Sequence, residues 1–373
     1  MTTPPPAQPA PQSPPQQPAP AAPALALTGG TVVTSLDPPR TATADVVIGG
    51  GRILSVGAAP AGVPRRDCSG ALVIPGNVCA HHHLYSALAR GMPYGLAPPA
   101  NFLEILQRVW WRLDRALDEA SVRASALVGG LEALRAGTTT VIDHHASPNF
   151  IDGSLDVIAA ALAELGLRGV LCYEVSDRDG AGPAAAGVAE NRRFLRRREP
   201  LSRGMVGAHA SFTLSDETLA ACVDAAERAG VGVHIHVAED GTDQASALAT
   251  HGTGVVERLA AAGVLTPAAL LAHCVDVSEA QAAAIVAAGA AVAHNARSNM
   301  NNRVGYSPLA QAGPRVALGT DGIGGDMITE SQLAHFRAVE ACAATEPGWP
   351  LRRLAEGAAL AGRCFGEPLL GRI

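Results

Sequence analysis

Residues 75–83 read PGNVCAHHH, which is a Pro-Gly turn, a short apolar run and three consecutive histidines. Side chains of a β-strand alternate between its two faces, so a strand here would point His81 and His83 one way and His82 the other way. The triplet is therefore interpreted as an H-x-H pair with one histidine outside it. Whether this pair holds a metal depends on what other side chains the fold brings to it.

Strand-like runs follow along the rest of the chain and alternate with apolar stretches at helical spacing. Eight such β-runs with helices between them indicate an α/β protein built on a (β/α)₈ TIM-like barrel. The eight runs are 77–83, 138–145, 168–175, 204–210, 232–239, 269–274, 291–295 and 315–321.

Three segments are predicted from these patterns. Residues 1–24 are rich in Pro, Ala and Gln, which predicts a disordered tail. Residues 25–76 contain short β-rich runs broken by Gly, which predicts a small antiparallel sheet, the N-terminal part of a small β-sandwich-like domain. Residues 77–373 form the predicted barrel.

Composition excludes several classes of function. The 373 residues carry a net charge of −6 without blocks of like charge, which argues against nucleic acid and against a membrane as partners. The chain contains no lysine, which excludes Schiff-base catalysis and a Walker-type phosphate site. Seven scattered cysteines without a C-x-x-C pair, and no long apolar run, favour a cytoplasmic protein.

Polar side chains gather at the carboxyl ends of the predicted strands, where barrels of this kind carry their active sites. They are His81, His83, His144, His209, His236, His273, Asn295 and Asp321. The run HIHVAE repeats the H-x-H pattern, with His234 and His236 on one face. Two histidines from the first strand, one from the fifth and a carboxylate from the eighth would form a mixed N/O site suited to Zn²⁺ or Fe²⁺, with a position open for water.

Several motifs together resemble the amidohydrolase superfamily: PGNVCAHHHLYSALARGM, GTTTVIDHHASPN, HIHVAED, LLAHC and LGTDG. Within it they are similar to the aminohydrolase branch, which holds cytosine, guanine and S-adenosylhomocysteine deaminases and the triazine hydrolases. The segments NFLEILQRVWWRLDRALDE, LCYEVSDRDG, HASFTLSDETL and SNMNN most resemble SsnA-like aminohydrolases. The resemblance runs from about residue 27 to the end.

The resemblance implies a role for each matching residue. The implied metal ligands are His81, His83, His236 and Asp321. The implied catalytic residues are Glu239, which moves protons, His273, which holds the attacking water or polarises the substrate, and Asp321, which also accepts a proton. His209 matches a substrate-contacting histidine, and Tyr85 lies just past the first ligands, where it could face the substrate. In HNARSNMNN, Ala296 stands where relatives carry a proline.

The implied function is hydrolysis of a non-peptide C–N bond by metal-bound hydroxide. The expected reaction is a deamination that releases ammonia from a purine-, pyrimidine-, pterin- or triazine-like ring, with a small heterocycle as the substrate. Because no lysine can form a carboxylated bridge between two metals, one divalent ion is expected, Zn²⁺ before Fe²⁺. A cyclic-amide or chlorotriazine hydrolase and a non-catalytic binding scaffold stay open as alternatives.

Other features carry weaker expectations. Trp110 and Trp111 are predicted to lie in the core, with an aromatic cap over a flat substrate as the alternative. His82 and His234 are expected in the core or behind the ligands, and one of His144 and His145 could line the pocket. Relatives continue beyond the last helix with further strands of the small domain, so its C-terminal part is expected to be missing. Residues 25–76 would then exchange amide hydrogens fastest among the ordered parts, or be covered in a homodimer.

Overall fold

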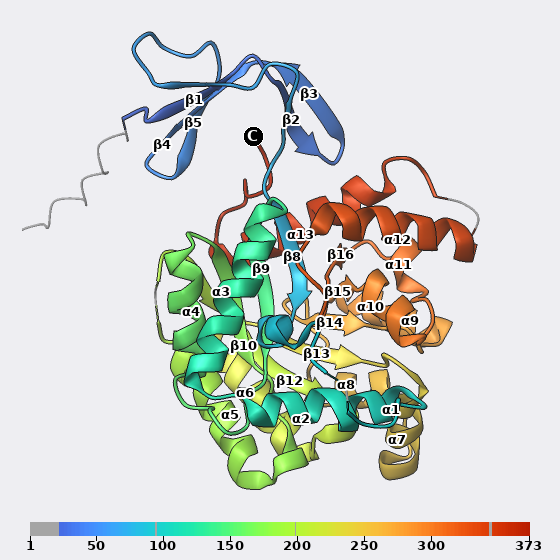
Figure 1. Ribbon diagram of the computed structural model, residues 1–373. Coiled ribbons are helices and arrows are strands. Elements are labelled where there is room, and N and C mark those ends of the chain that lie inside the picture. The colour runs from blue at the N-terminus through green and yellow to red at the C-terminus, as the bar shows by residue number, and fades with distance from the viewer. Residues whose placement is uncertain (1–21, 94, 198, 343–344) are drawn as a thin grey trace, which may run out of the picture. The chain divides into compact units, whose positions relative to one another are not determined.

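The computed structural model describes residues 22–373 apart from 94, 198, 343 and 344 (Figure 1). Residues 1–21 of the predicted disordered tail lie outside this range. Within the described residues, the chain divides into two compact units. The N-terminal unit comprises residues 22–33 and 41–74, and the parallel-sheet unit comprises 34–40 and 75–372.

The N-terminal unit contains a four-stranded sheet in the order β5-β4-β1-β6. Strand β4 pairs antiparallel with β1 and β5, as predicted, whereas β1 and β6 are parallel, which the prediction of an antiparallel sheet did not include. The β4–β5 hairpin turns at Gly50 and Gly51, whose φ angles of 56° and 73° suit glycine and the tight turns of hairpins. The strands are β1 (Leu25–Thr28), β4 (Asp45–Gly49), β5 (Arg52–Gly57) and β6 (Arg65–Asp67).

A second small sheet has the order β3-β2-β7. Its strands are β2 (Thr31–Leu36), β3 (Pro39–Thr43) and β7 (Leu72–Val73), and β2 and β7 run parallel. The predicted sandwich of the small domain stays a prediction.

All eight predicted β-runs contain a strand of the parallel-sheet unit. The first sheet has the order β11-β10-β9-β8 and the second the order β12-β13-β14-β15-β16, with parallel pairing throughout. Single parallel bridges, His82 to Asp321 and Val175 to Ala208, link the two sheets. The strands are β8 (Asn77–His82), β9 (Thr138–His145), β10 (Arg168–Tyr173), β11 (Ser202–Gly204), β12 (Val206–Ala210), β13 (Val233–Val237), β14 (Leu270–His273), β15 (Ala291–His294) and β16 (Val316–Leu318).

Helices alternate with these strands and lie outside them (Figure 1). Two of the helices begin at capping boxes: Asp118 and Ser121 form one at α3, and Ser278 and Gln281 form one at α9. The helices are α1 (Phe102–Ile105), α2 (Trp111–Leu113), α3 (Glu119–Arg135), α4 (Ser154–Glu164), α5 (Ala181–Phe194), α6 (Asp216–Ala229), α7 (Gly241–His251), α8 (Val255–Ala261), α9 (Glu279–Ala288), α10 (Ala296–Asn302), α11 (Leu309–Ala312), α12 (Met327–Cys342) and α13 (Trp349–Phe365).

The strands of the parallel-sheet unit are buried almost throughout, which is the pattern of parallel sheets covered by helices. Apolar side chains such as Ile142, Leu171 and Ile235 fill the core, so the histidines at the strand ends are held on a rigid base. Among the described residues, no helix combines the length and the apolar character needed to cross a membrane.

Candidate metal centre and pocket

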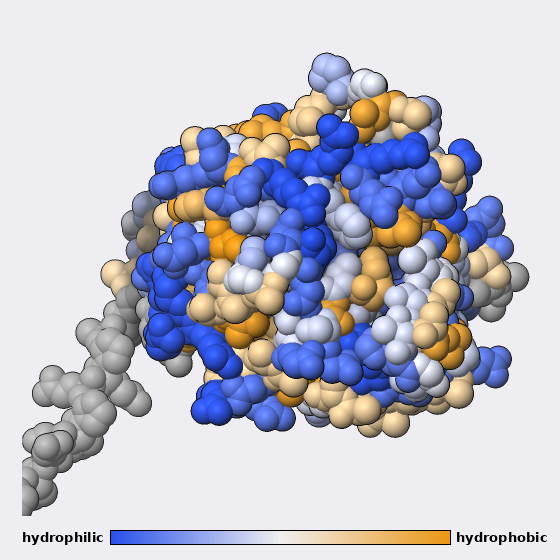
Figure 2. Space-filling view, turned by 90° about the horizontal axis from the view of Figure 1, so that it is seen from below, coloured by the Kyte–Doolittle hydropathy of each residue, from blue (hydrophilic) through white to orange (hydrophobic). Residues whose placement is uncertain are grey.

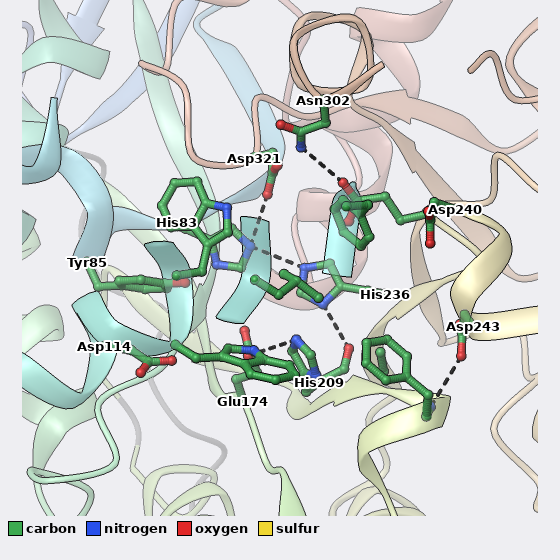
Figure 3. Close-up of a pocket in the computed structure, with 17 residues that line it drawn as sticks. His83, Tyr85, Asp114, Glu174, His209, His236, Asp240, Asp243, Asn302 and Asp321 are labelled. Atoms are coloured by element: carbon green, nitrogen blue, oxygen red, sulfur yellow. Dashed lines mark hydrogen bonds and ion pairs between the residues drawn. The ribbon is translucent and has the colours of Figure 1, made fainter. Parts of the chain in front are cut away.

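The four predicted ligands come together at the carboxyl ends of β8, β13 and β16. One ligand atom from each of His81, His83, His236 and Asp321 lies within 4.8 Å of the other three. His83 Nε2 is 3.1 Å from Asp321 Oδ1 and 3.2 Å from His236 Nε2. All three histidines are buried, and Figure 3 shows His83, His236 and Asp321 pointing toward one another. The residues that sequence alone selected are therefore neighbours in space.

Hydrogen bonds on the far side of the rings determine which nitrogen faces inward. His83 Nδ1 donates to the carbonyl of His144 at 2.6 Å, and His236 Nδ1 donates to the carbonyl of His209 at 2.8 Å. Each Nε2 therefore carries a lone pair, and two such lone pairs repel each other unless a proton or a cation lies between them. His81 Nε2 is buried without a hydrogen-bond partner. The donor set fits a divalent cation.

The charge state of the cluster supports this fit. Burial by itself lowers the pKa of His83, but the adjacent Asp321 carboxylate outweighs it and raises this pKa to about 9. Burial opposes ionisation of Asp321, yet the close His81 and His83 rings, whose Nε2 atoms lie 3.5 and 3.1 Å from Asp321 Oδ1, hold the pKa of Asp321 well below its usual range. Without a metal, a proton thus occupies the space beside the carboxylate. Metal binding has to displace this proton, so the affinity of the site for the metal should depend on pH.

His81 is held from behind by a chain of buried polar groups. Its Nδ1 is 2.8 Å from His234 Nε2, and His234 Nδ1 is 3.6 Å from the sulfur of Cys172, which donates to the carbonyl of Asp143. His234 thus supports a ligand from behind and does not face the cluster. His82 points away and bonds to Thr320 Oγ1 at 2.8 Å, as the strand alternation predicts.

Glu239 and His273 lie next to Asp321. Glu239 Oε2 is 3.4 Å from His273 Nε2, and both belong to a close group with Asp321. Burial, reinforced by the nearby Asp321 charge, raises the pKa of Glu239 well above its usual range, which favours the protonated acid. His273 and Asp321 have φ angles of 72° and 53°. Non-glycine residues seldom adopt this region, which costs about 1–3 kcal/mol and is enriched at functional sites.

Helix α10 contacts each of these three groups. Asn302 Nδ2 donates to Glu239 at 3.3 Å, Asn299 Oδ1 accepts from His273 Nδ1 at 2.8 Å, and Ser298 Oγ donates to Asp321. This helix begins at Ala296, where the resembling loop of relatives carries a proline. The replacement therefore does not prevent an ordered segment here.

A pocket with aromatic walls opens in front of the cluster (Figure 3). Tyr85 and His209 line it, as expected for substrate contacts. Trp110 and Trp111 also line it and are half-buried, so the aromatic-cap alternative fits the structure, while Trp110 packs against the hydrophobic core as well, as predicted. Trp110 ends the π-helical turn Leu106–Trp110, which follows α1, and Trp111 begins α2.

Sequence reasoning overlooked four acidic residues of this pocket, and two of them, Glu174 and Asp114, lie across it from Asp321 in Figure 3. Glu174 Oε2 is 3.0 Å from His144 Nδ1, and its other oxygen is 3.6 Å from His209 Nε2. Glu174 directly follows β10, so the signal that identified the other strand-end residues could have found it.

Asp114 carried no such signal because it lies in a short 3₁₀ turn. It is ion-paired with Arg178. His145 is fully buried and bonds to Ser147, and neither His144 nor His145 is among the described residues that line the pocket. The expectation that one of the two lines the pocket is therefore wrong, although His144 reaches the pocket through Glu174.

Comparisons with known proteins agree with this arrangement. Residues 72–362 match the model of the amidohydrolase family. The chain is 33% identical to a 5-methylthioadenosine/S-adenosylhomocysteine deaminase of Desulforudis audaxviator, over 75% of this chain and 65% of that protein. It is 32% identical to a 5'-deoxyadenosine deaminase of Methanothermobacter thermautotrophicus, over 72% of this chain and 63% of that protein. The chain thus spans slightly less than two thirds of the length of these relatives.

Solved structures share the fold. A zinc-bound adenosine deaminase from Xanthomonas campestris aligns with a TM-score of 0.78 at 24% identity, over 92% of this chain and 80% of that chain. A zinc complex of atrazine chlorohydrolase from Arthrobacter aurescens aligns with a TM-score of 0.80 at 23% identity, over 93% and 84%. With a family match over most of its length and the predicted ligands gathered at the strand ends, the chain belongs to the amidohydrolase family.

Proposed function

We propose that this protein is a metal-dependent aminohydrolase, which hydrolyses the exocyclic C–N bond of an aminated heterocycle and releases ammonia. The observation that carries the proposal is the position of Glu239, a buried acid, beside both His273 and Asp321 at the edge of the predicted metal cluster. The names of the relatives, which are deaminases of adenosine derivatives, favour a purine-like ring. The two bridges between the sheets support a closed (β/α)₈ barrel as the scaffold.

The proposed cofactor is one divalent ion held by His81, His83, His236 and Asp321, with Zn²⁺ favoured and Fe²⁺ as the alternative. Such an ion lowers the pKa of a coordinated water from 15.7 toward about 7, which supplies a nucleophile at neutral pH. A second group, His83, His144, Glu174 and His236, could also hold an ion. Because it would need the same Nε2 atoms of His83 and His236, both positions cannot be filled together, which favours a single metal.

The side chains around the reacting carbon have complementary proton-transfer roles. Glu239, in its acid form, donates a proton to the ring nitrogen while water attacks the adjacent carbon, and it then helps the amine leave as ammonia. Asp321 accepts a proton from the attacking water. His273 Nδ1 is committed to Asn299, so its Nε2 is an acceptor; Asn295 Nδ2 donates to it at 3.3 Å, and we propose that the same water replaces this donor when substrate is bound. The overall change converts a ring C–NH₂ and water into a ring carbonyl and ammonia.

The pocket walls would hold the ring. Tyr85 packs edge-on against His83 at a centroid distance of 5.3 Å, and Trp111 packs against His209 at 6.1 Å. We propose that Tyr85 and His209 contact the substrate and that the two tryptophans cover its flat face. The indole of Trp110 packs closely against Gly322, the residue that follows Asp321. A Cβ atom at position 322 would lie 2.8 Å from the indole, so the missing side chain of Gly322 leaves room for the tryptophan.

Ammonia release from the zinc- or iron-loaded protein tests the proposal. The panel should contain adenosine derivatives, aminopurines, aminopyrimidines, pterins and triazines, with the Glu239→Gln protein as the inactive control. We expect ammonia from at least one adenosine-like compound. Chloride release from a chlorotriazine without ammonia from any amine would instead favour the chlorohydrolase alternative. A metal-loaded protein that acts on no compound would favour a binding scaffold.

A further inference from the structure

The pocket combines aromatic walls with an acidic lining. Five of the chain's 13 aromatic residues line it: Tyr85, Phe102, Trp110, Trp111 and Phe212. Six acidic residues line it as well, of which Glu239 is the one favoured in its protonated form: Asp114, Glu174, Glu239, Asp240, Asp243 and Asp321. No arginine is found among the described residues that line this pocket, and the chain has no lysine at all. Only the proposed metal would supply positive charge, and it faces the reacting carbon rather than the substituents.

Two arginines next to the aromatic wall are already paired with acidic groups. Arg178 bonds to Asp114 and lies over the ring of Trp111 at 5.5 Å, and its side chain is only 7% exposed. Arg108 bonds to Glu104 and to backbone carbonyls of the preceding loop. An anionic ligand could recruit either guanidinium only by breaking an existing ion pair. The Arg178–Asp114 pair is buried, and breaking such a pair is strongly unfavourable.

We propose that this pocket selects against anionic ligands and takes a flat, neutral or cationic aminated heterocycle. A cleft lined by one sign of charge focuses the field and changes the association rates of charged ligands by roughly 10- to 10³-fold. Aromatic faces add attraction for a cation but not for an anion. The statement about substrates rests on the proposed deaminase function, whereas the charge selection applies to any ligand that enters the pocket.

This inference separates the two compounds that the name of the first relative joins. 5-Methylthioadenosine carries an uncharged thioether, whereas S-adenosylhomocysteine ends in an amino acid that carries both an ammonium group and a carboxylate. The ammonium group suits the acidic lining, but the carboxylate would find no cationic partner among the described residues of the pocket lining and would lose its hydration. The compound without a carboxylate should therefore be the better substrate of this protein.

Asp240 is the most suitable place to alter the charge. It is half-exposed at the pocket, and no ion pair is found for it within the described part of the chain. Its side chain caps α7 by accepting from Thr242 N at 2.8 Å. Because Asn caps helices as well as Asp does, Asp240→Asn removes the charge and keeps the cap. Figure 2 views the end of the molecule where α1 and α2 lie, and hydrophilic residues dominate this face.

The direct test measures metal removal from the zinc-loaded protein by two flat chelators, neutral 1,10-phenanthroline and dianionic pyridine-2,6-dicarboxylate. We expect Asp240→Asn to speed extraction by the dianion several-fold and to leave extraction by phenanthroline unchanged. Added salt should act in the same direction, because it screens exposed charges. The control Glu227→Gln makes the same change in net charge at an exposed site near the end of α6 and should alter neither rate.

A dianion rate that is insensitive to both Asp240→Asn and salt would overturn the charge selection. The second arm compares kcat/KM for 5-methylthioadenosine and S-adenosylhomocysteine. Equal values, or a preference for the carboxylate, would also overturn it. If neither compound is turned over, the adenosine-type function fails, and the chelator rates alone decide the charge selection.

Discussion

Strands β8 and β13 carry the same H-x-H pattern but use it differently. Both His81 on β8 and His83, the residue after its end, join the predicted metal cluster, with ring centroids 4.8 Å apart. On β13, only His236 joins it, and His234 lies deeper and bonds to His81. Spacing in the sequence therefore does not determine whether a histidine is a ligand. Whether a histidine becomes a ligand depends on its position along the strand and on the shape of the strand.

A bulge explains the difference. Between Cys79 and His82, β8 advances three residues while its neighbour β9 advances two, from Val141 to Asp143. Such a bulge bends the strand and redirects its side chains. Strand β13 pairs with β14 without a shift, so its two histidines stay one full repeat apart along the strand, about 6.6 Å.

The largest effect is expected for a ligand. His83→Ala should reduce the bound metal from about one ion per chain to near zero and abolish ammonia release, because it removes one of four donors. Elemental analysis of the purified protein measures the first effect. His82→Asn is the matched control within the triplet and should keep its metal. If His82→Asn lost metal as completely as His83→Ala, the assignment of the pair would be wrong.

Glu239→Gln should come next. It should keep the metal but lower turnover by roughly 10²-fold or more, the usual scale for loss of general acid–base catalysis. Metal content and kcat on the same preparation separate this effect from ligand loss. Wild-type activity in this variant would show that the proton takes another route.

His234→Ala tests the comparison between the two strands directly. Loss of the bond to His81 Nδ1 should weaken metal affinity by roughly 10- to 100-fold, as is typical for partners that orient a ligand. Competition with a metal-binding dye measures the affinity, and thermal unfolding of the metal-free protein reports any separate loss of stability. If His234→Ala lowered the metal affinity as much as His236→Ala, both histidines of β13 would act as ligands, and His234 would not merely support His81.

The smallest effect is expected one step farther from the metal. Cys172→Ala removes a weak contact to His234 Nδ1, and a net loss of about 0.5 kcal/mol would change metal affinity by only about twofold. The same dye competition applies. A tenfold loss would mean that the whole buried chain behind His81 acts as one unit.

Much of this site could be predicted because two signals coincide. Buried parallel strands are continuous apolar runs, and a polar residue where such a run ends is conspicuous, as at His236 and Asp321. The bulge in β8 left no mark in the sequence. The partial exposure of Trp110 and Trp111 could not be predicted either. An apolar stripe on a helix has the same sequence pattern whether it packs against a core or lines a ligand pocket. Parallel pairing between β1 and β6 depends on long-range chain crossing, which local patterns do not encode.

The position of the tryptophans has a spectroscopic consequence. The chain has three, and two of them, Trp110 and Trp111, line the pocket. The third, Trp349, is 2% exposed at the start of α13 and is not among the residues lining the pocket. Its emission should therefore be a constant background. The intrinsic fluorescence of the unlabelled protein should report occupancy of the pocket, and a flat aromatic ligand stacked on the indoles should quench it even when no turnover follows.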